Sequence, residues 1–373
     1  MRTDLEIEQL GPAPSVPVRH RPRPKRPRVP LEWVAGAAAA ILLVVLAYFV
    51  FSSRETKKVV PAGASSRSVA ISRDGTRLAV GLLDGSLRVI DLSSGKLLGE
   101  HKSEKPGEPP LSPITAVAFG PANSVLALRA RESKLYIFSP ELQSHTQRSI
   151  QPNAHDLVWS RALDAALVLA GGEDDLHAKI EVFPARPLGI QSSTAQLLNL
   201  VTWITPKYIT VTGDGSRVAI SYDSTRKMNV LIYDPRARRT TSALLLRGEP
   251  EGLAFAANGN ALWVASPHAE TVTEVTGYTV TPIQLPKLAS TSPPRMIAVN
   301  QRLRRAYTTG SLTFPEIELD RRKITRTVEL PERSAGIVLS PDESTAYLTF
   351  ERLDIVGVVD LQAMRWVREI QLR

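Results

Sequence analysis

The chain contains no cysteine among its 373 residues. This absence excludes a disulfide framework, thiolate zinc sites, iron–sulfur clusters and a cysteine nucleophile. Aromatic residues are scarce, at 6%, and charged residues make up only 22% of the chain. Because 43% of the residues are hydrophobic, the chain has ample material for a core and does not have the composition of a disordered protein.

The common signatures of catalysis and nucleotide binding are also missing. There is no phosphate loop of the GxxxxGKS/T or GxGxxG type and no GxSxG nucleophile elbow. The six histidines are scattered without HxH or HxxxH spacing, at His20, His101, His145, His155, His177 and His268. The sequence therefore predicts no catalytic residues and no cofactor.

One cluster of potential metal ligands stands out after Gly171-Gly172. It consists of Glu173, Asp174, Asp175 and His177. Oxygen ligands at this density could hold Ca²⁺. Solvated carboxylates in a loop would give the same pattern, so both interpretations stay open.

The N-terminal segment is basic and rich in proline. Residues 12–30 interleave proline with six Arg or Lys residues. Proline removes backbone donors and like charges repel, so we expect a disordered tail over residues 1–32.

A run of 20 residues without a charge follows, from Trp33 to Ser52. As a helix it would span about 30 Å, the thickness of the hydrocarbon core of a bilayer. We therefore predict a transmembrane helix over 33–52, acting as an uncleaved signal anchor and followed by a linker over 53–67. A cleaved signal peptide and a buried core helix are the alternatives.

The residues that flank this run indicate its orientation. Six Arg or Lys residues lie in the 15 residues before it and four in the 15 after it. This bias favours a single-pass protein with a cytoplasmic N-terminus and an extracytoplasmic C-terminal region. The chain has no N-x-S/T sequon, which favours the inner membrane and periplasm of a bacterium over a eukaryotic secretory route.

Beyond residue 67 the sequence repeats. An apolar strand that ends in a turn recurs at positions 91, 139, 184, 234, 276, 320 and 360. The mean interval of about 45 residues is typical of propeller blades, and no long 3.6-residue apolar pattern intervenes. Seven units, starting near residues 68, 114, 154, 208, 250, 294 and 334, predict an all-β fold: a seven-bladed β-propeller of four-stranded blades over 68–373. Six or eight blades remain as alternatives.

The first unit shows the plan of a blade. Its four strand candidates are Ser68–Ser72, Arg77–Leu82, Ser86–Leu92 and Lys96–His101. The breaks between them are Asp74-Gly75, Asp84-Gly85 and Ser94-Gly95, which are hairpin signals. An aspartate such as Asp91 at the end of a third strand is expected to cap the turn that follows.

Two segments resemble the YVTN and WD40-like β-propeller repeats: SVAISRDGTRLAVGLLDGSLRVIDLSSGKLLGE and GIVLSPDESTAYLTFERLDIVGVVDLQ. The resemblance covers about 300 residues and implies a fold, not an activity. The Trp-Asp dipeptide of true WD40 repeats is absent. The positions of its tryptophan are occupied by Ile90, Tyr233, Leu319 and Val359.

Charge is unevenly distributed along the chain and between the faces of the expected propeller. More than half of the net charge of +9 lies in residues 1–58, which argues against nucleic acid as a partner of the folded region. In each blade, the turn between strands one and two and the turn between strands three and four share one face. The basic residues concentrated in these turns are Arg236, Arg238, Arg239, Arg302, Arg304, Arg305, Arg321, Arg322 and Lys323.

These nine residues are candidates for binding an acidic protein partner or an anionic envelope polymer. An ordinary solvated surface is the alternative. Together, the features favour a membrane-anchored, non-catalytic scaffold or recognition module that contacts the bilayer through 33–52. Two other functions stay open: a membrane-tethered propeller enzyme, for instance a lactonase-like hydrolase, and a cytoplasm-facing hub of the WD40 kind.

Overall fold

The computed structural model describes residues 64–102, 112–129, 132–172, 175–185, 193–196, 205–223, 228–256, 258–284 and 295–372. Contacts between Cα atoms divide the chain after Val59, and all described residues lie in the second unit, Val60–Arg373. Within the described ranges, no helix is long and apolar enough to cross a membrane. The predicted tail, the predicted span and most of the predicted linker lie outside these ranges.

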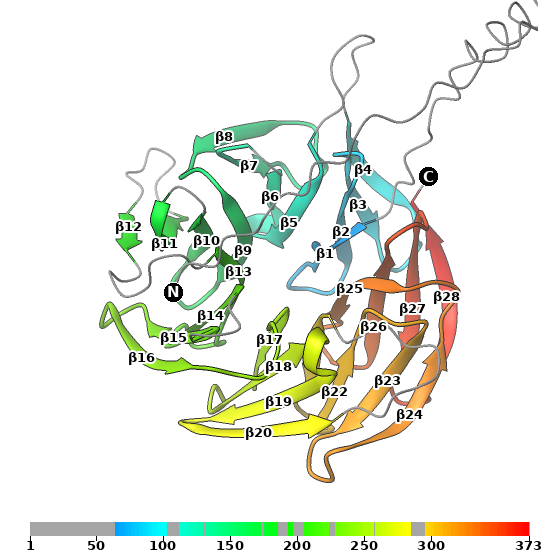
Figure 1. Ribbon diagram of the computed structural model, residues 1–373. Coiled ribbons are helices and arrows are strands. Elements are labelled where there is room, and N and C mark those ends of the chain that lie inside the picture. The colour runs from blue at the N-terminus through cyan, green and yellow to red at the C-terminus, as the bar shows by residue number, and fades with distance from the viewer. Residues whose placement is uncertain are drawn as a thin grey trace, which may run out of the picture. The chain divides into compact units, whose positions relative to one another are not determined.

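The second unit is an all-β propeller with seven blades of four antiparallel strands (Figure 1). Blades one and two comprise β1 (Ala64–Ile71), β2 (Arg77–Leu82), β3 (Leu87–Asp91), β4 (Leu97–His101), β5 (Ile114–Phe119), β6 (Val125–Arg129), β7 (Lys134–Phe138) and β8 (His145–Ser149). Blades three and four comprise β9 (Ala154–Ser160), β10 (Ala165–Gly172), β11 (Asp175–Pro184), β12 (Ser193–Gln196), β13 (Thr205–Val211), β14 (Val218–Asp223), β15 (Val230–Asp234) and β16 (Arg239–Leu244).

The last three blades follow the same order. They comprise β17 (Gly252–Phe255), β18 (Ala261–Ser266), β19 (Thr271–Thr276), β20 (Thr279–Gln284), β21 (Ile297–Asn300), β22 (Arg305–Thr308), β23 (Thr313–Glu318), β24 (Lys323–Glu329), β25 (Ser334–Leu339), β26 (Thr345–Phe350), β27 (Ile355–Asp360) and β28 (Arg365–Gln371). Two short 3₁₀ helices, η1 (Pro121–Asn123) and η2 (Pro267–Ala269), lie in connections.

Each blade is held to its two neighbours because successive side chains of a strand point to opposite faces of the sheet. In β18, Leu262 and Val264 pack against blade four, whereas Trp263 and Ala265 pack against blade six. The same alternation occurs around the ring, and one hydrophobic cluster lies between each pair of neighbouring blades. The core of this propeller is therefore distributed over the interfaces between blades.

The seven first strands surround the central channel. Each of them contacts the first strands of the blades on either side, and β25 of the last blade contacts β1. A parallel backbone pairing of Arg67 with Ala116 joins β1 to β5, so that blades one and two form one eight-stranded sheet. The contact of β25 with β1 closes the ring, and no strand is exchanged between the first and last blades.

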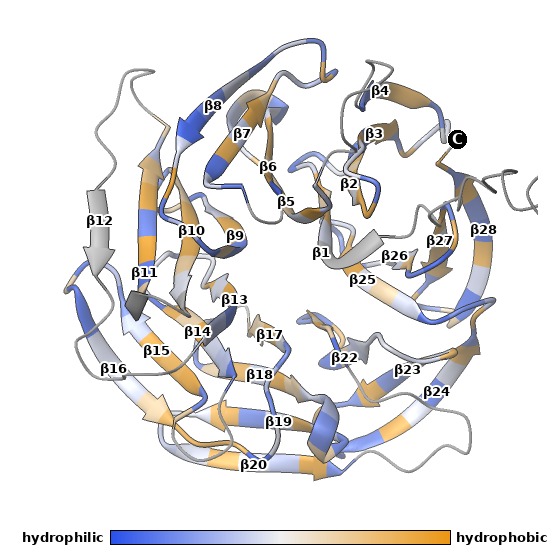
Figure 2. Cartoon of the chain, turned by 45° about the horizontal axis from the view of Figure 1, so that its top comes forward, coloured by the Kyte–Doolittle hydropathy of each residue, from blue (hydrophilic) through white to orange (hydrophobic). Residues whose placement is uncertain are grey.

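Burial changes from the inner to the outer strands. The second strands β6 and β18 are buried along almost their whole length, whereas the outer strands β8, β24 and β28 are mostly exposed. Figure 2 shows the corresponding change from hydrophobic to mixed and hydrophilic residues. The buried side chains of a blade therefore lie mainly on its inner strands.

The architecture confirms the predicted all-β fold and the count of seven four-stranded blades. In the first blade, β2 has the predicted bounds, and β3 and β4 differ from theirs by one residue at the ends. β1 differs more, because it begins at Ala64, four residues before the predicted start of the repeat.

Candidate partner-binding surface

The predicted metal cluster cannot be placed. Glu173 and Asp174 lie outside the described residues, as do the side chains of Asp175 and His177. Among the residues that the structure describes, no group of three or more His, Cys, Asp or Glu residues is arranged to hold a metal ion.

The turns between the third and fourth strands are held by aspartate side chains. The carboxylate of Asp91 accepts hydrogen bonds from Ser93 Oγ (2.6 Å) and the backbone N–H of Ser94 (2.7 Å), and these lower the pKa of Asp91 to about 2. Asp234 and Asp360 each accept two backbone N–H groups at 2.9 Å. The predicted capping role is therefore confirmed at these three turns, and the backbone that carries the neighbouring side chains is well fixed.

The same turns place arginine in the left-handed backbone region. Arg238 has φ 52° and Arg322 has φ 53°, at the position that Gly95 occupies with φ 71° in the first blade. A residue with a Cβ pays a conformational cost of about 1 kcal/mol in this region, which glycine avoids.

The nine predicted basic residues lie on blades four and six. Arg236 and Arg238 belong to the turn between β15 and β16, and Arg302 and Arg304 to the turn between β21 and β22. Arg321 and Arg322 lie between β23 and β24. Three of the nine are not turn residues, because each is the first residue of a strand: Arg239 of β16, Arg305 of β22 and Lys323 of β24.

Four of the nine form ion pairs. The contacts are Arg304 Nε to Asp320 (2.7 Å), Arg305 to Glu318 (3.3 Å) and Glu316 (3.6 Å), Arg321 to Glu318 (3.5 Å) and Arg322 to Glu274 (3.5 Å). Arg305 is only 25% exposed and lies between two carboxylates, so it belongs to the internal ion-pair network of blade six. This position argues against the predicted role of Arg305 in binding a partner at the surface.

The side chains of the other five form no ion pair within the described chain. They are Arg236, Arg238, Arg239, Arg302 and Lys323. The Arg236 guanidinium instead donates to the backbone carbonyl of Asp214 at 3.1 Å. The nearby carboxylates of Asp234 and Glu343 accept from the backbone N–H groups of Arg236 and Arg302.

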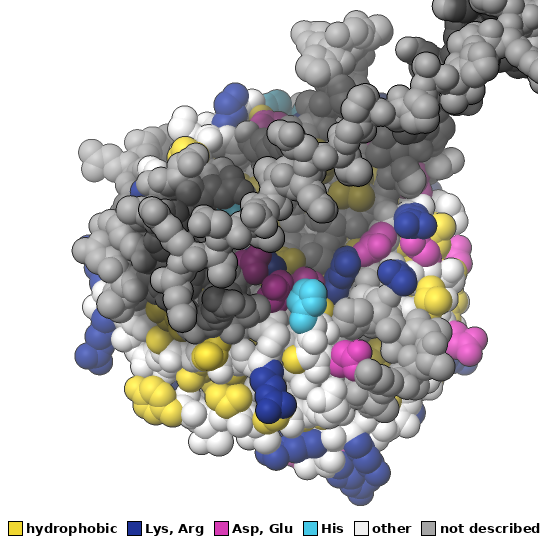
Figure 3. Space-filling model, in the orientation of Figure 1, with side chains coloured by type: hydrophobic (Ala, Val, Ile, Leu, Met, Phe, Trp, Pro, Cys, Tyr) yellow, Lys and Arg dark blue, Asp and Glu magenta, His cyan; other side chains and the backbone are white. Residues whose placement is uncertain are grey.

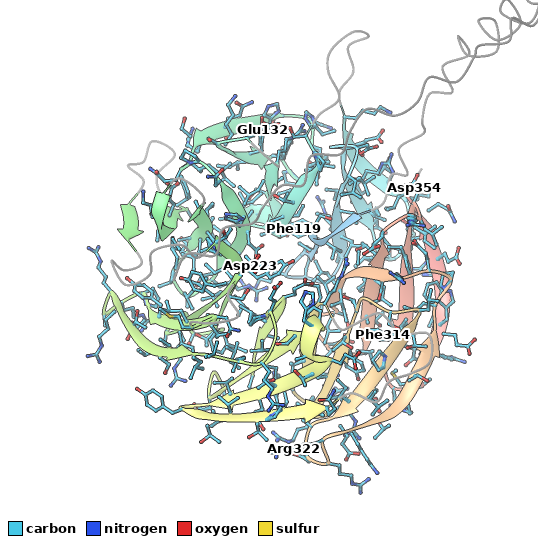
Figure 4. The ribbon with its side chains drawn as sticks, in the orientation of Figure 1. Phe119, Glu132, Asp223, Phe314, Arg322 and Asp354 are labelled. Carbon is cyan, nitrogen blue, oxygen red and sulfur yellow. The ribbon has the colours of Figure 1, made fainter. Side chains whose placement is uncertain are left out.

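Blade five connects the two groups of arginines. Tyr278, at the tip of the β19–β20 hairpin, is 80% exposed, and its hydroxyl donates to the carbonyl of Thr241 on blade four (3.3 Å). The Arg322 guanidinium reaches Glu274 of β19 from the other side. Figure 4 shows Arg322 at the outer end of the β23–β24 hairpin, away from the ring centre. We call the eight residues other than Arg305, together with Tyr278 and Leu303, the basic surface.

Tyr278 and Leu303 were not predicted as surface residues of interest. Leu303 is 39% exposed within the β21–β22 turn, between Arg302 and Arg304. A signal was present for Tyr278, because Gly277-Tyr278 has the Gly-X pattern of a two-residue hairpin turn, and connections of this kind run over the surface.

The opposite face, formed by the remaining connections, has a different electrostatic character. Lys207 lies 3.2 Å from Glu249 and 3.4 Å from Asp223, and His268 lies 3.5 Å from Glu249. Burial alone would lower the pKa of Lys207, but the hydrogen bond and charge of Glu249 and the charge of Asp223 outweigh it and raise this pKa. Figure 3 shows acidic, basic and histidine side chains together near the middle of this face. The charges of Lys207, Glu249 and Asp223 are therefore paired with one another.

Comparison with known proteins identifies the fold. No family model matches the sequence, and no curated protein matches it. Among solved structures, hydrazine synthase of Kuenenia stuttgartiensis is similar, with a TM-score of 0.68 and 14% identity over 82% of this chain and 97% of that chain. The Cps50 (Swd1) β-propeller domain of Myceliophteria thermophila has a TM-score of 0.56 and 13% identity over 81% of this chain and 94% of that chain. At these identities the similarity shows the β-propeller fold alone. It supports a WD40-like fold but does not show that the chain belongs to the YVTN or WD40 repeat families.

Proposed function

We propose that this protein is a single-pass, membrane-anchored β-propeller that acts without catalysis as a docking platform for an acidic protein in a cell-envelope assembly. The observation that carries the proposal is the basic surface itself. It presents Arg236 and Arg238 on a turn that is fixed by the Asp234 cap, and the charged groups of five of its basic side chains have no carboxylate of the described chain within 4.0 Å. A preorganised cationic surface of this kind attracts anionic partners and orients them.

A protein is favoured over an anionic polymer because the charges are interleaved with apolar area. Tyr278 and Leu303 expose 80% and 39% of their surface between the arginine groups. Tyrosine and arginine are the side chains that most often dominate the binding energy of protein interfaces. A polyanionic polymer would need the charges but not the exposed aromatic ring.

The membrane anchor in this proposal is residues 33–52, with the N-terminus in the cytoplasm and the propeller in the periplasm. The support is the uncharged run and the excess of Arg and Lys before it. β1 runs from Ala64 toward the face of the basic surface, so the chain enters the propeller at the opposite face. The basic surface would therefore be free of the tether.

Topology can be tested directly because the chain has no cysteine. Single cysteines at Thr3 and at Arg365 would be labelled in intact cells with a membrane-impermeant maleimide. The proposed topology requires labelling of Arg365→Cys once the outer membrane is permeabilised, and labelling of Thr3→Cys only after lysis. The reverse pattern would identify a cytoplasm-facing hub.

Docking can be tested by crosslinking and affinity capture of the full chain from membranes. We would change three residues to Glu, namely Arg236, Arg238 and Lys323. None of these side chains forms an ion pair within the described chain. A matched control would reverse the exposed Arg247, Arg333 and Arg352 on the other face. Loss of the partner with the first variant alone supports the proposal, and capture should also weaken when salt is raised from about 0.05 to 0.5 M. Equal capture by wild type and both variants would contradict it.

A further inference from the structure

The central channel contains a cavity of about 660 Å³ at the end where the first and second strands of the blades are joined. Its walls come mainly from β1, β5, β9 and β25 of blades one, two, three and seven, and Met296, next to β21, adds a contribution from blade six. Figure 4 shows one wall residue, Phe119, near the middle of the ring, whereas Arg322 lies at the periphery. The cavity is therefore distinct from the basic surface on blades four to six.

The walls of the cavity combine apolar and polar surface. The apolar part is formed by side chains that include Val69, Ile71, Phe119, Leu157, Trp159 and Val338. Ile71, Trp159 and Val338 are only partly buried, so part of their apolar surface is available inside the ring. Burial of this area by a ligand would be favourable at roughly 25 cal/mol per Å². The volume lies within the range of about 300–1,000 Å³ that is usual for small-molecule sites.

The rim of the cavity carries charge. Arg73 comes from the turn of blade one, and Arg161 and Asp164 come from the turn of blade three. All three are exposed, so the cavity opens at this face. Neither arginine has a carboxylate within 4.0 Å among the described residues.

Asp74, next to Arg73, is directed toward its own turn. Its carboxylate accepts hydrogen bonds from Ser72 Oγ (2.6 Å) and Thr76 Oγ1 (2.8 Å), and the side-chain amide of Asn123 donates to it at 3.5 Å. The negative charge of Asp74 offsets part of the charge of Arg73, but Asp74 does not line the cavity. The charged groups that line the rim itself are the two guanidinium groups and the carboxylate of Asp164.

We infer that this cavity is a binding site for a small organic carboxylate with an aromatic or branched aliphatic body. The apolar walls would hold the body, and Arg73 and Arg161 would hold the carboxylate, for which the planar guanidinium is the best-matched donor. A cation is disfavoured by the two arginines. A polyphosphate is disfavoured by Asp164 and would gain nothing from the apolar walls.

The test uses the full chain in lipid nanodiscs and isothermal titration calorimetry. The probe is naphthalene-2-acetate, and naphthalene-2-acetamide is its uncharged isostere. The acid should bind saturably to one site, and the amide should bind at least about tenfold more weakly, because it forms no charge-assisted hydrogen bonds. In Arg73→Gln/Arg161→Gln the acid should bind as weakly as the amide does.

A matched variant on the same face, outside both the cavity and the basic surface, is Lys96→Gln/Arg365→Gln, which should bind the acid like wild type. Trp159 provides a second readout, since Trp159→Leu should weaken the calorimetric binding of acid and amide alike. The four substituted basic residues, Arg73, Arg161, Lys96 and Arg365, are exposed, so circular dichroism should be unchanged. Absence of saturable heat, or equal affinity for acid and amide in wild type and in Arg73→Gln/Arg161→Gln, would overturn the inference.

Discussion

The guanidinium of Arg368, in the last strand, donates a hydrogen bond of 2.6 Å to the backbone carbonyl of Leu92, 276 residues earlier in the first blade. Beneath this contact, Val358 and Ile370 of blade seven pack with Leu78 and Val80 of blade one. A hydrogen bond from a charged donor therefore reinforces a hydrophobic interface at the point where the ring closes.

Removal of this hydrogen bond should weaken ring closure. We expect Arg368→Met to lower the free energy of unfolding by about 1 kcal/mol, because the methionine retains much of the aliphatic length but leaves the Leu92 carbonyl without this donor. The control is Arg365→Met in the same strand, where the side chain is 73% exposed and its contact with Asp360 is 4.0 Å. Urea denaturation followed by circular dichroism would measure both, and equal effects would contradict the prediction.

The packing of Trp366 on Gly357 gives a second prediction. A Cβ on Gly357 would lie 2.3 Å from the indole ring, so Gly357→Ala should lower the free energy of unfolding by roughly 1–3 kcal/mol. Combination with Trp366→Leu should recover part of this loss, because the obstructing ring is removed. Gly213→Ala is the control, since a Cβ there would meet no atom within 4 Å. Additive effects of the two substitutions in a double-mutant cycle would show that the ring is not the cause.

The capped turns predict how stability depends on pH. Hydrogen bonds, chiefly from the side chains of Ser93 and Thr212, lower the pKa values of Asp91 and Asp214 to about 2 in the folded protein, whereas an unfolded aspartate titrates near pH 4. Their contribution to stability is therefore complete above about pH 4 and is lost as the pH falls toward 2. Asp91→Asn/Asp214→Asn should reduce the slope of stability against pH in this window. Chemical denaturation at several pH values would measure it, and an unchanged slope would refute the assignment.

The left-handed conformation of Arg238 predicts that loss of its side chain stabilises the fold, whatever its effect on partner binding. Arg238→Gly should raise the free energy of unfolding by roughly 0.5–1 kcal/mol, because glycine adopts φ 52° without steric cost. The neighbouring Ala237→Gly should not stabilise, since Ala237 does not have a positive φ. Thermal unfolding would compare the two variants. A destabilised Arg238→Gly would mean that the arginine side chain contributes to the fold.

Much of the fold could be predicted from local patterns. The short apolar run in Arg77–Leu82 and the Asp-Gly breaks on either side of it define strands and turns through interactions between near neighbours. The period of about 45 residues then sets the number of blades. The aspartates Asp91, Asp234 and Asp360 were assigned as caps for the same reason, because their partners lie two or three residues away.

Other features depend on residues that the ring brings together from distant parts of the sequence. Arg305 has the same chemistry as its neighbours in the sequence, yet contacts with Glu316 and Glu318 make it part of an internal network. The cavity joins Arg73, Phe119, Arg161 and Val338, which no spacing in the sequence relates. The sequence by itself determined the blade and its repetition, because these depend on local hydrogen bonding in the turns and on short apolar runs in the strands. Only the tertiary structure decided which arginines are exposed and what lines the channel, because ring closure sets both.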